Sequence, residues 1–304
     1  MTELVAVPAT RPASLLVVGT GLIGTSIALA ARSGGLRVAL ADTEPAALAA
    51  AVARGAGRAA ADTDPPADLA VLAVPPDRVP GVLRDAQHRR LATVWTDVAS
   101  VKAPVLAGAE AAGCDLASFV PGHPMAGSER AGPAAADGRL FAGRTWALCP
   151  VKGTDPGAVD AVRGLVRLCG ATPVTLSPQA HDRAVAAVSH TPHLVAAVLA
   201  AVLARVPAED LRLAGTGVRD TTRIAAGDPE LWTQILALNA TEVGAVAEAV
   251  AADLCRAAAA LRAGPPDLAV LAELLAAGRA GRAALTRTTP AGPQPAQARD
   301  LASR

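Results

Sequence analysis

Short apolar runs alternate with amphipathic stretches over the first part of the chain, up to Pro178. The run 15–18 is too short for a helix; a glycine loop follows it, and then a helical pattern that ends at Gly34 and Gly35. Because strands that alternate with helices form mostly parallel sheets covered on both faces, the pattern predicts an α/β domain with a doubly wound sheet. Its further strands are predicted at 37–42, 68–76, 93–100, 118–125, 144–151 and 171–177.

The pattern changes after Pro178, where strand-like runs stop and long segments rich in Ala, Leu and Val take over with helical periodicity. The first segment, 181–206, contains Pro192, which predicts either one helix that is kinked there or two helices that meet. Two more long helices are predicted at 231–264 and 267–285. Such alanine-rich helices have apolar surface to spare, so we expect an all-α C-terminal domain that forms a homodimer.

A chain of 304 residues fits two domains of ordinary size. We expect the α/β domain at 14–178 and the helical substrate and dimerisation domain at 179–288. The segments outside them, 1–13 and the tail 289–304, which is rich in Pro, Ala and Gln, are expected to be disordered.

Composition and charge argue against several kinds of partner. The net charge is +1 and only 2% of the residues are aromatic, so the chain offers neither a basic stripe for phosphates nor rings on which bases stack, which argues against nucleic acid. Although 52% of the residues are hydrophobic, no apolar run reaches the roughly 18 residues that a bilayer requires. The N-terminus has no basic segment ahead of an apolar core, and the four cysteines are scattered. We therefore expect a cytoplasmic protein that acts on a small molecule and does not bind membranes.

Three glycines, Gly19, Gly21 and Gly24, stand between the first strand and the first helix with the spacing GxGxxG. In this setting the first glycine permits a tight turn, the second lets the backbone approach a pyrophosphate, and the third allows the helix to pack closely on the strand. The domain is therefore predicted to be of the Rossmann type and to bind a dinucleotide. Cofactor contacts are expected from Gly19, Gly21, Leu22, Ile23, Gly24, Asp42, Val74 and Pro75.

Asp42, at the end of the second predicted strand, bears on the choice of dinucleotide. A carboxylate at this position accepts hydrogen bonds from the adenosine ribose diol and repels a 2′-phosphate, which favours NAD over NADP. Arg37, Thr43 and Arg54 lie near enough in the sequence to leave this preference open. FAD is the alternative dinucleotide, although a flavoprotein usually needs a longer chain.

His123 stands between Gly122 and Pro124, two residues that form regular structure poorly, so we expect it on a rigid loop where packing does not explain it. A metal site is the rival interpretation of the histidines. His190 and His193 have the spacing to share a helix face, but the sequence supplies no third ligand at a familiar spacing, and we predict no metal. For His181 and His193, partial burial at the domain junction is the alternative to a functional role.

Five motifs together resemble the prephenate and arogenate dehydrogenase family, in their order and surroundings, over roughly residues 14–290. They are GTGLIGTS at 19–26, DVASVK at 97–102, GHPMAGSE at 122–129, HDRAVAAVSHTPH at 181–193 and RDTTRIAAGDPELW at 219–232. The resemblance implies a Rossmann domain and a helical dimerisation domain. It also implies oxidation of a cyclohexadienol with NAD or NADP, with loss of CO2 to form an aromatic ring.

The residue chemistry agrees with that reaction. An alcohol loses its hydroxyl proton as hydride leaves its carbon, so a neutral imidazole within hydrogen-bond reach is the natural acceptor, and His123 is the candidate base. Ser100 resembles the family serine that bonds the same hydroxyl or the histidine; the alternative is that Ser100 caps the helix that follows it.

The substrate contacts are implied by the resemblance. Arg223 matches the family arginine that binds the ring carboxylate through a two-point fork, and Arg219 is a weaker candidate. His193 matches a substrate-contacting histidine, while His190 and Asp182 are expected to brace the domain junction. Trp232 is expected to form a hydrophobic wall or an interface anchor, and Glu129 a gate or an acid behind the residues that touch the substrate.

The leading hypothesis is an NAD-dependent dehydrogenase that converts prephenate to 4-hydroxyphenylpyruvate in tyrosine biosynthesis. The alternatives are an arogenate dehydrogenase that gives tyrosine directly, and a relative that acts on 4-amino-4-deoxyprephenate. The β-hydroxyacid dehydrogenases depend on a lysine in the helical domain, and this chain has no lysine after Lys152. The non-enzyme alternative, an NAD-sensing module, predicts damage to His123, Ser100, His193 and Arg223, yet all four are present.

Overall fold

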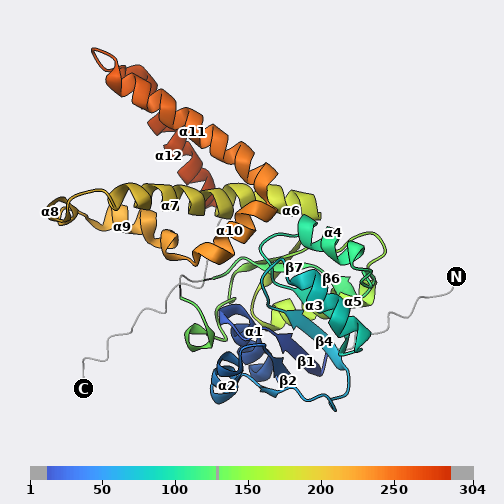
Figure 1. Cartoon of the computed structure of the whole chain (residues 1–304). Helices are drawn as coiled ribbons and strands as arrows, with labels where there is room; N and C mark the ends of the chain where they lie inside the picture. The colour runs from blue at the N-terminus through green and yellow to red at the C-terminus, as the bar shows by residue number, and fades with distance from the viewer. Residues whose placement is uncertain (1–11, 128–129, 289–304) are drawn as a thin grey trace, which may run out of the picture. The chain divides into compact units, whose positions relative to one another are not determined.

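The computed structural model describes residues 12–127 and 130–288 of the chain (Figure 1). The chain divides into two compact units, Met1–Val246 and Ala247–Arg304. The two terminal segments for which disorder is expected fall largely on residues 1–11 and 289–304, which lie outside the described residues.

A parallel sheet of six strands forms the framework of the first unit, as the apolar pattern predicts (Figure 1). The strand order is β3-β2-β1-β4-β5-β6. Successive strands are added to one side of β1 up to β3 and to its other side from β4 onward, and such a switch point leaves a crevice at the carboxyl ends of β1 and β4. The strands are β1 (Ser14–Val18), β2 (Arg37–Ala41), β3 (Arg58–Ala59), β4 (Ala67–Leu72), β5 (Ala92–Asp97) and β6 (Phe119–Val120).

Helices cover both faces of this sheet. Residues of β1 alternate between the faces: Leu15 and Val17 pack in one apolar cluster with Ile27, and Leu16 packs in the other with Leu83 and Val105. The first cluster draws on α1 (Leu22–Ser33) and α5 (Pro156–Leu168), and the second on α3 (Val79–His88) and α4 (Ala103–Ala111). A short helix, α2 (Pro45–Ala53), follows β2.

A second sheet of three strands follows, with β7 (Gly122–Pro124) antiparallel to β8 (Thr145–Leu148) and β8 parallel to β9 (Thr172–Thr175). The strand expected at 118–125 is therefore two strands, since the chain leaves the large sheet after β6 and enters the small one at β7. His123 is the middle residue of β7, where it pairs with Ala147. The expectation that His123 lies on a loop is wrong, because the backbone on both sides of it belongs to this ladder.

Pro192 neither breaks nor sharply ends the first helix of the C-terminal part. α6 (Pro178–Val185), a π-helical turn η2 (Ala186–His190) and α7 (Thr191–Leu203) form one helix of 26 residues, and Pro192, which has no N–H to donate, directly follows the π-helical turn. By length and composition alone this helix could cross a membrane. One third of its most apolar stretch is buried inside the protein, and its buried side chains include His181, Asp182 and His190.

The helix expected at 231–264 is two helices, α10 (Pro229–Leu238) and α11 (Ala240–Arg262), and the prediction of a single helix is wrong. The break lies at Asn239, whose buried side-chain amide donates a hydrogen bond of 2.9 Å to the Asp182 carbonyl oxygen and lies 3.1 Å from His190 Nδ1. Short helical segments precede α10, namely α8 (Ala208–Leu211), α9 (Thr216–Thr222) and η3 (Arg223–Ala226).

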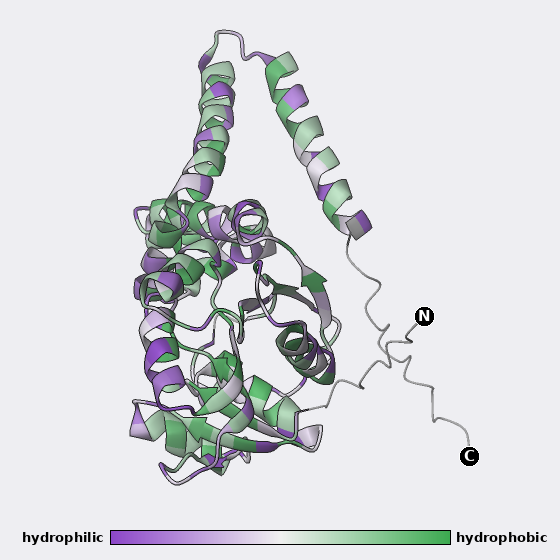
Figure 2. Ribbon diagram, turned by 90° about the vertical axis from the view of Figure 1, so that its right-hand side faces the viewer, coloured by the Kyte–Doolittle hydropathy of each residue, from purple (hydrophilic) through white to green (hydrophobic). Residues whose placement is uncertain are grey.

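The second unit contains the end of α11 and the predicted third helix, α12 (Leu268–Thr288). Arg256 joins these helices, since its guanidinium lies 3.1 Å from Asp253 and 3.2 Å from Glu273. Figure 2 shows apolar and polar residues mixed along both of them. Leucines of these helices are more than half exposed: Leu254, Leu261, Leu268, Leu275 and Leu285.

The turn between β1 and α1 is held by close packing at two of its glycines. Gly19 has a φ of +96°, and an added Cβ there would lie 2.3 Å from the Ala73 carbonyl oxygen. At Gly24 the added atom would lie 1.9 Å from the Gly19 carbonyl oxygen, whereas at Gly21 it would meet nothing within 4 Å.

Replacing Gly24 with Ala is therefore expected to lower the free energy of unfolding by about 1–3 kcal/mol, because the turn and the helix must move apart to admit the methyl group. Chemical denaturation of the purified protein measures this change. The matched control is Gly21→Ala, which adds the same atom to open space and should cost less. Equal stability of the two variants would contradict the packing role of Gly24.

Candidate active site

A cavity of about 420 Å³ opens at the carboxyl edge of the large sheet, within the first unit. The turn before α1, the segments that follow β4 and β5, strand β7 with the segment after it, and the start of α10 all contribute to its walls. The predicted site residues among its lining are Gly21, Leu22, Ile23, Gly24, Val74, Pro75, Ser100, His123 and Trp232. One cavity thus joins most of the predicted cofactor contacts to the predicted base.

The glycine turn fits the pyrophosphate of a dinucleotide. Gly21 is the N-cap of α1 and provides no side-chain capping bond, so the first N–H groups of the helix remain available to an anion. The space that a Cβ of Gly21 would enter is empty. Gly21, Leu22 and Ile23 all face the cavity there.

Asp42 directly follows β2 and is held in place by the same turn. Its Oδ2 accepts hydrogen bonds from the Thr20 backbone N–H at 2.6 Å and the Thr20 hydroxyl at 2.7 Å, and its Oδ1 accepts one from the Glu44 N–H at 2.9 Å. Burial acts to raise the pKa of this carboxyl, but the hydrogen bonds outweigh burial and the pKa is lowered. Asp42 is therefore a fixed, ionised acceptor at the end of β2.

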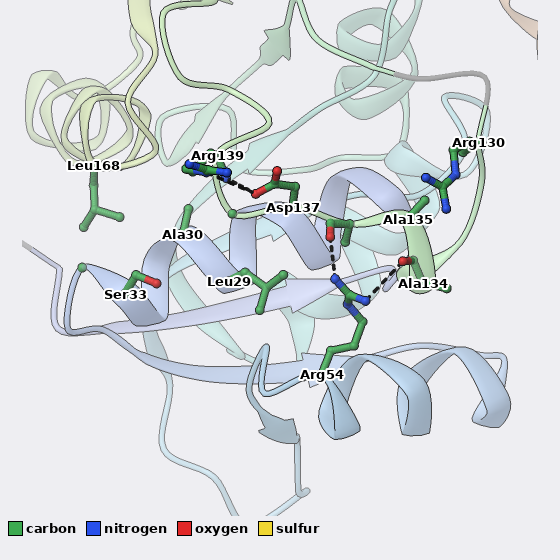
Figure 3. A pocket seen from close by; sticks show the side chains of 13 residues that line it. Leu29, Ala30, Ser33, Arg54, Arg130, Ala134, Ala135, Asp137, Arg139 and Leu168 are labelled. Carbon is green, nitrogen blue, oxygen red and sulfur yellow. Dashed lines mark hydrogen bonds and ion pairs between the residues drawn. The ribbon is translucent and has the colours of Figure 1, made fainter. Parts of the chain in front are cut away.

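Arg54, one of the residues that leave the cofactor preference open, points elsewhere. Its guanidinium donates hydrogen bonds to the carbonyl oxygens of Ala134 at 3.2 Å and Ala136 at 2.7 Å (Figure 3). These contacts border a separate, wider cleft of about 850 Å³ between α1 and the segment 134–139. Ser100, His123 and the glycine turn do not line that cleft, so it is not the site of the predicted chemistry.

A buried ion pair fixes the backbone beside His123. Lys102 and Asp97 are both fully buried and in direct contact through Nζ and Oδ2. Lys102 Nζ donates to the Gly122 carbonyl oxygen at 2.6 Å, and Asp97 Oδ1 accepts the Gly122 N–H at 3.0 Å. Both backbone groups of Gly122 are therefore held by one charged pair. The sequence contains both residues in its DVASVK motif, but nothing in their spacing reveals this role.

His123 lies at one end of a line of buried side chains. Its Nδ1 lies 2.9 Å from His181 Nε2, and His181 Nδ1 lies 2.7 Å from Asp182 Oδ1. Asp182 also accepts the backbone N–H groups of Lys102 and Ala103, each at 2.8 Å, at the start of α4. Only 8% of His123 and 1% of His181 are exposed. His181 is a member of this line that the sequence does not predict, because no local pattern indicates a contact across 58 residues.

Burial and the charge of Lys102 keep His123 neutral. Burial lowers the pKa of His123 well below its ordinary value, and the nearby ammonium of Lys102 lowers it further. For Asp182, burial acts to raise the pKa, but hydrogen bonds from His181 and from the N–H groups of Ala103 and Lys102 outweigh it, and the pKa is lowered. His190 is fully buried, and burial lowers its pKa to about 4.

Ser100 lines the cavity near this line, and its buried hydroxyl has no hydrogen-bond partner among the residues that the structure describes. The alternative that Ser100 caps the next helix is wrong, because α4 begins at Ala103 with Lys102 in the N-cap position. A buried hydroxyl without a partner is costly unless a ligand satisfies it. Ser100 is therefore suited to a polar group of a bound substrate.

Trp232 forms an apolar wall of the cavity, from α10. The ring of His193 stacks on the Trp232 ring, with centroids 3.5 Å apart and an interplanar angle of 10°. Gly227 packs against both, since an added Cβ would lie 2.6 Å from Trp232 Nε1 and 2.9 Å from His193 Cε1. His193 is buried and is not among the residues that line the cavity, so in this structure it supports the wall.

The two predicted arginines do not line this cavity. Arg223 begins η3 and Arg219 lies in α9, and both are exposed. The charged residues that do line the cavity are Arg130 and Asp228. Glu129, the predicted gate, lies outside the described residues.

Among the described residues, no group of three or more His, Cys, Asp or Glu side chains is arranged to hold a metal ion.

Two family models match nearly the whole of this architecture. The nucleotide-binding domain of prephenate dehydrogenase matches residues 27–175, and the dimerization domain of prephenate dehydrogenase matches residues 177–277. A relative from Streptomyces niveus, probable prephenate dehydrogenase NovF, is 44% identical over 242 residues, which make up 79% of this chain and 66% of that protein. The chain belongs to the prephenate dehydrogenase family.

Solved structures of this family share the fold. The prephenate dehydrogenase of Aquifex aeolicus, in complex with hydroxyphenyl propionate and NAD+, is 27% identical with a TM-score of 0.78, over 90% of this chain and 98% of that one. The arogenate dehydrogenase of Synechocystis is also 27% identical, with a TM-score of 0.69 over 88% and 99%. The curated relatives are longer, and the chain spans only 64% to 66% of their length, just under two thirds.

Replacing Lys102 with Met is expected to lower the free energy of unfolding by about 3–5 kcal/mol, because it leaves the Asp97 carboxylate buried without its counter-charge. Chemical denaturation measures the loss. The matched control is Arg84→Met, which removes the partner of an exposed carboxylate, Asp85, and should change stability little. Similar losses in the two variants would show that the buried pair does not hold the site.

Proposed function

We propose that this member of the prephenate dehydrogenase family oxidises prephenate with NAD and releases CO2, giving 4-hydroxyphenylpyruvate for tyrosine biosynthesis. The observation that carries the proposal is that His123, a neutral and anchored imidazole, lines the same cavity as the glycine turn. Both substrate and cofactor are proposals for this chain, because it spans just under two thirds of its curated relatives.

His123 is the base of the proposed reaction. Its Nδ1 faces His181, so Nε2 is the ring nitrogen left for a ligand in the cavity. This Nε2 accepts the proton of the substrate hydroxyl as hydride leaves the carbon that bears this hydroxyl. Bound NAD supplies the carbon that receives the hydride. The Ser100 hydroxyl, which has no partner among the described residues, forms a hydrogen bond with the reacting oxygen or with His123. Loss of CO2 requires little further help, since the electrons that remain complete an aromatic ring.

The cofactor is proposed to be NAD. The pyrophosphate fits against Gly21, Leu22 and Ile23 at the start of α1, with Gly19 and Gly24 shaping the turn and Val74 and Pro75 forming the opposite wall. Asp42 is proposed to accept the ribose hydroxyls and to repel a 2′-phosphate, and its fixed, ionised carboxylate at the end of β2 supports this role. The engagement of Arg54 with Ala134 and Ala136 supports the preference for NAD, because it removes one cation that a 2′-phosphate would need.

Substrate contacts are proposed from the resemblance and from the lining together. Trp232, supported by His193, forms the wall against the substrate ring, and Arg223 and Glu129 are proposed to bind the substrate and to close the site. Arg130 already lines the cavity in this structure. Arogenate and 4-amino-4-deoxyprephenate remain the alternative substrates. The NAD-sensing module remains the non-enzyme alternative, which the neutral, buried His123 disfavours.

The organisation of the whole protein follows the same proposal. We assign the NAD-binding domain to 14–178 and the helical domain to 179–288, with a homodimer formed through the helical domain. The exposed leucines of α11 and α12 support this dimer, because such apolar surface is commonly covered by a partner. The expected location is the cytoplasm, and neither nucleic acid nor a membrane is an expected partner.

Initial rates of NAD and NADP reduction, each with prephenate and with arogenate, test the proposed function directly. We expect turnover with prephenate and NAD, because Asp42 disfavours the 2′-phosphate of NADP. Preference for arogenate would keep the mechanism and change the substrate. No turnover with any of the four pairs would overturn the proposal.

Replacing His123 with Asn is expected to lower kcat by about 10²- to 10⁴-fold, which is typical for the loss of a general base. The Kd for NAD, measured by titration calorimetry, should remain unchanged. The matched control is His88→Asn, which changes a histidine of α3 that does not line the cavity. Full activity in the His123 variant would remove this residue from the mechanism.

A further inference from the structure

His181 and Asp182 lie behind the proposed base, outside the cavity lining. They form one line of hydrogen bonds with it, from His123 Nδ1 to His181 Nε2 and from His181 Nδ1 to Asp182 Oδ1. Packing alone does not explain two imidazole rings that meet edge to face at 69° with their nitrogens 2.9 Å apart. The direction of the protons along this line decides what His123 can do.

Asp182 sets that direction. Its two oxygens accept the backbone N–H groups of Lys102 and Ala103, and these bonds help to keep the carboxylate ionised and acceptor-only. His181 Nδ1 must therefore carry a proton, which it donates to Asp182. In the neutral ring this leaves the lone pair on Nε2, which accepts a proton from His123 Nδ1. The lone pair of His123 is then on Nε2, the nitrogen left for the cavity.

We infer that His181, held by Asp182, is a positioning residue that fixes His123 as the Nδ1–H tautomer, so that its only lone pair is presented to the substrate. The opposite tautomer would set two lone pairs against each other in a buried contact and would turn an N–H toward the hydroxyl, where a base is needed. The assignment of tautomers stands independently of the reaction; its effect on turnover rests on the proposed function.

The surroundings make this arrangement rigid. His181 is 1% exposed, so water does not replace it, and its neighbour Asp182 is fixed at the start of α4. The same segment, residues 97–103, holds Gly122 through Asp97 and Lys102. Both ends of the line are thus attached to one segment of backbone. When the substrate proton arrives at Nε2, His123 becomes an imidazolium whose Nδ1–H still donates to His181, which stabilises the new charge.

Nuclear magnetic resonance of the whole protein labelled with ¹⁵N-histidine tests the tautomers directly. The chain has only five histidines, and single replacements assign their signals. The ¹⁵N shifts should show a protonated Nδ1 and an unprotonated Nε2 for both His123 and His181. His190 is the internal control, since its Nδ1 lies 3.1 Å from the amide nitrogen of Asn239 and is expected to be unprotonated. A protonated Nε2 on neutral His123 would overturn the inference.

Two replacements of His181 test its effect on turnover. His181→Phe keeps a ring but removes the acceptor, and we expect kcat to fall about 10- to 100-fold with the Kd for NAD unchanged. His181→Gln places an amide oxygen near the position of Nε2 and should recover most of that loss. Equal loss in the two variants, or no loss in the Phe variant, would overturn the inference, because a merely structural role does not depend on the acceptor.

The experiments separate this inference from the proposed function. If the wild-type protein turns over none of the substrate pairs, the proposed function fails, while the ¹⁵N shifts still decide the tautomers. If His181→Phe does not fold, which thermal unfolding shows, the wild-type spectrum and the Gln variant decide the question instead.

Discussion

The contact between the Asp97 carboxylate and the Lys102 ammonium is the constraint on which the site depends. Two charges without access to water are costly, and an apolar pair of similar size is often no less stable. Here the charges also satisfy groups that an apolar pair would leave unpaired: the N–H and C=O of Gly122 and the N–H of Ala99. The pair therefore fixes the direction in which the chain leaves the large sheet after β6, and with it the position of His123 in β7.

The electrostatics of the site follow from the same pair. Lys102 places a positive charge near His123 in a buried environment, so both burial and charge favour the neutral ring, the form in which an imidazole accepts a proton. The backbone N–H groups of Lys102 and Ala103 help to hold Asp182 ionised, although Asp182 lies about 80 residues further along the chain. One short segment, 97–103, thus helps to keep the His123 ring uncharged and the Asp182 carboxylate behind it charged.

The sequence predicts the parts of this protein that are defined by local patterns. The glycine spacing and the strand before it locate the turn that lines the cavity, and Asp42 marks the end of the second strand, because turn geometry and strand ends are encoded within a few residues. The split of the strand at 118–125 and the break at Asn239 are not predictable in this way, since the hydrogen bonds found at both places join residues that are far apart in the sequence. The contact of His181 with His123 is not predictable for the same reason, because the two residues are 58 positions apart in the sequence.

The π-helical turn η2 (Ala186–His190) separates two histidines that serve different structures on one helix. His181, before the turn, contacts His123, and His193, after it, stacks on Trp232. A π turn adds one residue to a helix and so rotates everything beyond it by about 100° relative to a regular α-helix. The rotational phase of His193 is therefore set independently of that of His181. In evolutionary terms, gain or loss of a single residue at η2 would rebuild the stack of His193 on Trp232 while leaving the contact between His181 and His123 as it is.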